Sequence, residues 1–198
     1  MRGSIFWNDA LKYGAILGVV MSLSMIFEHY ILYYSDVALG KAMTLYLLEW
    51  VAVVGIYIWL LYRFTKNFSN NFEPEEGFSF VMGIGFAMTL NLLVAVIVGM
   101  ASTIFYSIAG FEGLIEGYIG RIDEMMSTVG DNNLAMQSLA ADMDALRDNV
   151  RAMEQPSMLM SIVGTVSNYV MWGIVIDAII ALVLRRKPVF VDRHNDEE

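Results

Sequence analysis

Five polar residues stand inside long apolar stretches of the chain and are the residues best placed to do chemistry. They are Glu28 and His29 in the first stretch, Glu49 in the second, Asn91 in the third and Asp177 in the fourth. An ionisable group within a membrane span is unfavourable by a few kcal/mol on insertion scales, so it is a functional candidate by default. These five residues are our candidate intramembrane polar group.

Glu28 and Glu49 are expected at similar depth, because only a short turn separates the first two apolar stretches. Two carboxyl groups held close together cannot both ionise easily, so the pair could hold a proton or a cation. His29 beside them could relay a proton. The structural alternative is that these three groups reach the headgroup region, where they would be solvated.

Asp177 is the hardest of the five to explain as a solvated group, because it lies about two helical turns before Arg185. Its structural alternative is a hydrogen bond to Asn91 or Asn168, with Tyr57 as a further polar neighbour.

Composition and motifs exclude several classes of site. The chain has no cysteine and only two histidines, so thiol chemistry, disulfides and a Cys- or His-rich metal site are not expected. The motifs GxxxxGKS or GxxxxGKT, HExxH and GxSxG are absent from the sequence. A net charge of −9 argues against nucleic acid as a partner. We therefore predict a protein that is not an enzyme and binds no cofactor, metal ion or nucleic acid.

The apolar stretches themselves predict the fold. The chain is 57% hydrophobic and 17% charged, whereas soluble domains carry about 25% charged residues. Four stretches are long enough to cross about 30 Å of hydrocarbon, namely 13–34, 43–62, 80–108 and 157–184. Gly14 and Gly18 form a GxxxG pattern that permits close helix contact. The prediction is an all-α integral membrane four-helix bundle, with residues 1–198 in a single membrane domain and the lipid bilayer as its surroundings.

The distribution of lysine and arginine predicts the orientation. With the N-terminus inside, eight basic residues face the cytoplasm, namely Arg2, Lys12, Arg63, Lys66, Arg185, Arg186, Lys187 and Arg193. The other side receives only Lys41, Arg121, Arg147 and Arg151. The positive-inside rule therefore favours two cytoplasmic termini.

Residues 111–155 predict an extramembrane helical hairpin between spans three and four. Apolar residues recur every three or four positions on both sides of a turn-like segment, Gly130 to Asn133. Pairing of the two arms, the membrane surface or another protein could cover these stripes. Nine acidic residues against three arginines disfavour a flat, lipid-bound helix. The candidate partner-binding residues are Leu139, Met143, Leu146 and Val150.

The order of segments resembles the DUF4199 family. The resemblance rests on the KYGAILGVVMSLSMIF span, the LYRFTKNF exit from span two, the EGFSFVMGIGFAMTLNLL entry to span three, the acidic outer segment and the final RRK. It covers nearly the whole chain. It implies a small four-span protein of the kind found mainly in Bacteroidota, in the inner membrane of a Gram-negative cell. The family supplies no catalytic residue.

Two functions fit these observations. The first is a non-enzymatic accessory, scaffold or assembly subunit that contacts a membrane-protein partner through a periplasmic hairpin. The alternative is a small transporter or channel that uses the intramembrane carboxylates for proton or cation coupling. Four spans scarcely enclose an aqueous path alone, so transport would require a homo-oligomer.

Overall fold

The computed structural model describes residues 2–128 and 134–189, without the side chains of Arg2, Thr128 and residues 134–141. The predicted turn from Gly130 to Asn133 lies outside the described residues. The described chain is helical, and its elements in order are α1 (Arg2–His29), the π-helix η1 (Tyr30–Tyr34), α2 (Leu39–Ser69), α3 (Phe80–Ala109), α4 (Phe111–Thr128), α5 (Leu134–Arg151) and α6 (Met158–Leu184).

Four helices are long and apolar enough to cross a membrane, in agreement with the predicted fold class. They are Gly3–Tyr34, Leu39–Ser69, Phe80–Ala109 and Met158–Leu184. The first begins well before residue 13, because Phe6 packs against Phe68 and Phe86 and thereby keeps the first turns of α1 on the bundle.

Capping residues mark where α3 and α6 begin and where α3 ends. The Ser79 and Ser157 hydroxyls accept hydrogen bonds from the backbone N–H groups of Met82 and Met160, at 3.2 and 3.3 Å, and so cap α3 and α6. Gly110 ends α3 with φ of +87°, a conformation that favours glycine.

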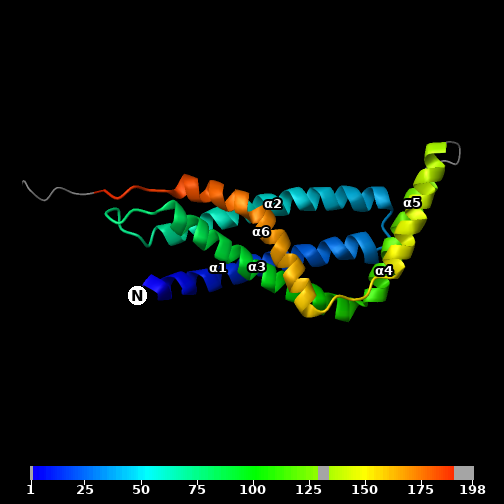
Figure 1. Cartoon of the computed structure of the whole chain (residues 1–198), viewed down its shortest axis with the longest axis horizontal. Coiled ribbons are helices and arrows are strands. Elements are labelled where there is room, and N and C mark those ends of the chain that lie inside the picture. Colours follow the sequence, from blue (N-terminus) through cyan, green and yellow to red (C-terminus); the bar gives the residue numbers. More distant parts are fainter. Residues whose placement is uncertain (1, 129–133, 190–198) are drawn as a thin grey trace, which may run out of the picture.

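The long helices lie side by side, with α4 and α5 across one end of the bundle (Figure 1). We call this the α4–α5 end. The opposite end, which carries the N-terminus, the loop 70–79 and residues 185–189, is the terminal end. The α4–α5 pair is inclined to the bundle and extends past α2 (Figure 1).

Helix α3 is the central helix and makes most of its contacts with α1 and α6, whereas α2 is less covered. Small residues permit the close approaches. A Cβ at Gly14 or Gly18 would lie within 3 Å of Leu93 or Ile97 on α3. The GxxxG pattern thus serves contact within the chain. On the α6 side of α3, Gly83 similarly faces Ala181.

The core is concentrated toward the terminal end. The Phe68 and Phe86 rings stack with centroids 4.0 Å apart, and Tyr13 stacks on Phe64 at 4.4 Å. Phe78 and Arg186 form an antiparallel β-bridge with both N–H···O distances at 2.9 Å, which ties the loop after α2 to the segment after α6. This end of the bundle is therefore closed by aromatic packing and backbone pairing.

Candidate functional site

Asp177 belongs to a buried polar network midway along the bundle. Its Oδ2 accepts a hydrogen bond from Asn91 Nδ2 at 2.7 Å, and Asn91 Oδ1 accepts one from the Tyr57 hydroxyl. Asp177 and Asn91 are almost fully buried. A Cβ at Gly173 would lie 2.4 Å from Asn91 Nδ2, so α6 needs glycine there to admit the amide. The network joins α2, α3 and α6, and the Asn91 bond is one of the alternatives that the sequence left open.

One oxygen of this network is unpaired within the described part of the chain. Asp177 Oδ1 is buried and has no hydrogen-bond partner there. The Tyr57 ring contacts the Tyr169 ring, with centroids 6.1 Å apart and nearly perpendicular. Tyr169 in turn lines a pocket nearer the α4–α5 end. The network therefore reaches toward that pocket through two tyrosine rings.

This pocket has a volume of about 330 Å³ and lies between α1, α3 and α6. We call it the outer-half pocket because it lies in the half of the bundle nearer the α4–α5 end. Its lining residues are Met21, Ser24, Met25, Glu28, Val98, Gly164, Thr165, Asn168 and Tyr169. Gly164 and Asn168 are exposed, so the pocket opens sideways between α1 and α6. It combines hydroxyl, amide and carboxyl groups with methionine and valine.

Glu28 and Glu49, the two carboxyl groups expected at similar depth, lie near each other beside this pocket. Glu28 lies within electrostatic range of Glu49, as the expected similar depth requires. Glu49 accepts a hydrogen bond from the Ser24 hydroxyl, and Ser24 also lines the pocket. Asp177 is separate from this pair, so the structure brings two of the three intramembrane carboxyl groups together.

His29 has partners other than the carboxylates. Its Nδ1 lies 2.7 Å from the Met25 carbonyl oxygen, and its Nε2 lies 3.0 Å from the Tyr106 hydroxyl. Because a carbonyl oxygen only accepts, Nδ1 carries the hydrogen, and in the neutral ring Nε2 accepts from Tyr106. Among the described residues this ring makes no direct hydrogen bond to Glu28 or Glu49, so the proton relay stays a prediction.

A second site lies at the α4–α5 end, where Arg121 of α4 binds the segment from η1 to the start of α2, residues 30–39. We call this segment the outer turn because it lies at the α4–α5 end, and we call its contacts with Arg121 and Glu124 the clasp. The Arg121 guanidinium donates to the backbone carbonyls of Leu32 and Val37 at 2.7 Å, of Ser35 at 3.1 Å and of Ile31 at 3.3 Å. These carbonyls lie at and just after the end of η1, where helical N–H partners are missing. A cation there also complements the helix dipole.

Glu124 completes the clasp from one turn further along α4. Its Oε2 pairs with Arg121 Nη1 at 3.0 Å, and its Oε1 accepts from the Leu39 N–H at 2.6 Å. Leu39 begins α2, so the carboxylate satisfies a free N–H at a helix N-terminus. The Leu39 bond, together with Arg121, holds the pKa of Glu124 below its usual range. Thus one ion pair on α4 caps the end of one span and the start of the next.

Small and aromatic residues seat α4 against η1. A Cβ at Gly117 would lie 1.9 Å from the Tyr33 carbonyl oxygen, so only glycine fits at this contact. The Tyr33 and Tyr118 rings stack at 5.1 Å, and the Tyr34 hydroxyl donates to the Gly110 carbonyl at 2.8 Å. Sequence reasoning missed this clasp. The signal that the sequence offered was the spacing of Gly113, Gly117 and Arg121, which follow one another at intervals of four residues and so lie on one face of a helix.

The candidate partner-binding residues do not share one environment. Leu146 is 40% exposed and Met143 is partly buried, whereas Val150 is 2% exposed. The side chain of Leu139 lies outside the described residues. Arg147 on α5 pairs with Asp123 on α4, which helps to join the two arms. Leu146 is therefore the candidate that the structure leaves most accessible.

Among residues 2–128 and 134–189, no three His, Asp or Glu side chains gather in a way that could hold a metal ion. Comparison with known proteins finds no matching curated protein and no matching solved structure. The family model "Protein of unknown function (DUF4199)" matches residues 12–186, which is most of the chain. Because this match covers most of the chain, the protein belongs to the DUF4199 family.

Proposed function

We propose that the chain is a non-enzymatic, multi-pass protein of a bacterial inner membrane that acts as an accessory, scaffold or assembly subunit. The observation that carries this proposal is the clasp of Arg121 and Glu124, which holds α4 against η1 and α2. A docked pair of helices presents a surface in one orientation, and this lowers the entropy lost when a partner binds.

The exposed side of the α4–α5 pair supplies contact groups of two kinds. Met125 and Leu146 are each 40% exposed. Exposed acidic side chains, including Asp142 and Asp148, lie on α5 as well. Apolar groups with a polar rim are typical of protein interfaces. The proposed partner is a membrane protein whose outer segment carries positive charge.

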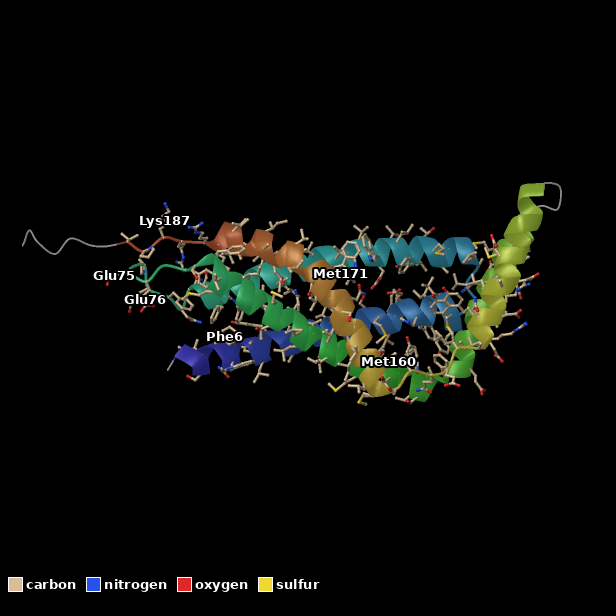
Figure 2. The ribbon with its side chains drawn as sticks, viewed as in Figure 1. Phe6, Glu75, Glu76, Met160, Met171 and Lys187 are labelled. Carbon is tan, nitrogen blue, oxygen red and sulfur yellow. The ribbon has the colours of Figure 1, made fainter. Side chains whose placement is uncertain are left out.

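The proposed orientation places both termini in the cytoplasm and the α4–α5 pair in the periplasm. Lys12, Arg63 and Lys66 each lie over an aromatic ring, at 5.5, 5.2 and 5.9 Å from the ring centroids. Figure 2 shows Lys187 at the same terminal end. Basic residues beside aromatic residues are typical of a cytoplasmic membrane interface, which supports this orientation.

The test is recovery of a partner from native membranes by chemical crosslinking, affinity purification and mass identification. We expect Leu146→Asp to reduce recovery of a reproducible partner by about tenfold, because a charge replaces an exposed apolar contact. Asn149→Asp is the matched control, since it adds the same charge at another exposed position of α5. Equal recovery from wild type and Leu146→Asp, at equal membrane levels, would reject the proposal.

A second candidate function is proton- or cation-coupled transport by an oligomer, and the outer-half pocket with Glu28 favours it. The measurement is ion flux into proteoliposomes that contain the purified chain. Wild-type flux in Glu28→Gln, Glu49→Gln and Asp177→Asn would remove these carboxylates from any transport mechanism.

A further inference from the structure

The outer-half pocket is unfilled because of how the helices pack. Helices α1 and α6 pack mainly on α3 rather than on each other. Gly164 lines the pocket from α6, and a Cβ there would meet no atom within 4 Å. A groove therefore remains between α1 and α6 at this level, and it is large enough for a small molecule.

Glu28 gives the pocket its charge. Its side chain is half-buried, and among the described residues it has no hydrogen-bond donor and no cation as a partner. The neighbouring Glu49 does not line the pocket, and within the described part of the chain its one hydrogen-bond partner is the Ser24 hydroxyl. A carboxylate in a membrane span is unfavourable unless a positive group compensates it. The pocket is thus complementary to a cation.

The rest of the surroundings indicates which kind of cation fits. Met21, Met25 and Val98 give the pocket an apolar wall, and Tyr169 adds an aromatic ring. The Tyr33 and Tyr106 hydroxyls lie within electrostatic range of Glu28. Small inorganic cations require several oxygen ligands in a defined shell. Carboxylates with aromatic rings and apolar groups instead suit an alkylated ammonium.

We propose that the outer-half pocket binds a small organic cation, an ammonium with apolar substituents, whose positive charge lies at Glu28. Ligand carbon atoms contact Met21, Met25 and Val98, and Ser24 and Thr165 supply hydroxyl groups to a polar substituent. The site deepens the second candidate function by naming a ligand class, but binding does not require transport. It is also independent of the partner surface on α4 and α5.

The test is equilibrium binding of radiolabelled choline to the full chain in phosphatidylglycerol nanodiscs, with empty nanodiscs as the blank. Such discs contain no competing ammonium headgroup. Unlabelled 3,3-dimethylbutan-1-ol is the neutral analogue of the same shape. We expect saturable choline binding that unlabelled choline displaces and the neutral alcohol does not, since charge recognition carries the affinity.

Two variants locate the site. Glu28→Gln removes the charge at constant shape, and Gly164→Leu fills the pocket at constant charge. Each should weaken choline binding by about tenfold or more, the ratio that corresponds to about 1.4 kcal/mol. The matched controls are Glu116→Gln on α4 and Gly85→Leu on α3. Glu116 is exposed and outside the spans, and a Cβ at Gly85 has open space around it. Both controls should bind as the wild type does.

Three results would overturn the proposal. They are no saturable choline binding to the wild type, unchanged binding in Glu28→Gln or Gly164→Leu, and equal displacement by the neutral alcohol. If Gly164→Leu does not fold, Glu28→Gln and the neutral analogue still decide the question. Flux and partner recovery are measured separately, so failure here is distinct from failure of either function above.

Discussion

The two halves of the bundle are built differently. At the terminal end, aromatic rings fill the space between the helices, and Phe78 and Phe86 are completely buried. Toward the α4–α5 end, α1 and α6 leave a pocket lined by polar groups, and Arg121 and Glu124 of α4 form hydrogen bonds to backbone groups of residues 31–39. Close packing stabilises a structure, whereas an open polar pocket is available to a ligand. The closest packing and the proposed sites therefore lie in opposite halves of this bundle.

The largest expected effect is that of Phe86→Ala in the terminal half. Phe86 stacks on Phe68 and contacts Phe6, and its removal leaves a cavity, so the variant should lose about 3–5 kcal/mol of unfolding free energy. Met21→Ala at the pocket should lose less, about 2 kcal/mol, because Met21 is only partly buried and the pocket beside it is already open. Titration with a denaturing detergent measures the unfolding free energy of both variants. Equal losses would contradict the division into a packed and an open half.

Arg121→Met should detach α4 from the outer turn. Four backbone carbonyls lose a charged donor, which should weaken docking of α4 by about 2–3 kcal/mol. Amide hydrogen exchange in residues 30–39 should become faster. Arg151→Met is the control, since Arg151 is exposed and its one ion pair among the described residues is with Asp148 at 3.7 Å, so exchange in residues 30–39 should be unchanged. Unchanged protection in Arg121→Met would show that the clasp does not position α4.

Gly117→Ala tests the same contact by steric means. The added methyl group would clash with the Tyr33 carbonyl oxygen, so α4 must shift, at about 1–3 kcal/mol. Gly120→Ala adds the same group where no atom lies within 4 Å and should be neutral or slightly stabilising. Thermal unfolding midpoints of the two variants provide the measurement. A melting temperature for Gly117→Ala at or above that of Gly120→Ala would refute the close approach.

The smallest effect is the pH dependence that Glu124 contributes. Because its pKa is lowered in the folded protein by the Leu39 N–H and Arg121, ionisation favours the clasp. Its stabilisation is present above the ordinary carboxyl pKa and is lost as pH falls through the lowered folded value. The melting temperature difference between wild type and Glu124→Gln should therefore decrease with acidification and then vanish. A melting temperature difference that grows at low pH would show that ionised Glu124 does not stabilise the folded protein.

Much of the helical layout was predictable because it depends on local composition. The four apolar stretches predicted four membrane-spanning helices, and the structure confirms this number in the part of the chain that it describes. The helix that contains the predicted first span begins earlier, at Arg2, and Phe6 is held there by aromatic partners from α2 and α3 that no local pattern reveals. The expected similar depth of Glu28 and Glu49 is consistent with the electrostatic interaction between them, because a short turn sets their relative height.

The sites depended on distant residues and were only partly predictable. Asn91 was among the expected partners of Asp177, yet the role of Gly173 in admitting its amide required the packing of α6 on α3. The partner of His29 Nε2 is the Tyr106 hydroxyl, which lies far along the chain and could not be named from local sequence. Arg121 carried no motif, and its acceptors are backbone carbonyls, which have no sequence signature.

The sequence by itself determined that this protein has four apolar helices, polar groups within them and an acidic segment between the third and fourth. These properties follow from hydrophobicity and periodicity, which act locally. Only the tertiary structure decided that α4 is clasped to the outer turn and that α1 and α6 leave a pocket at Glu28. The physical reason is that both features arise from close approaches between residues distant in sequence, where the fit of side chains decides which groups meet.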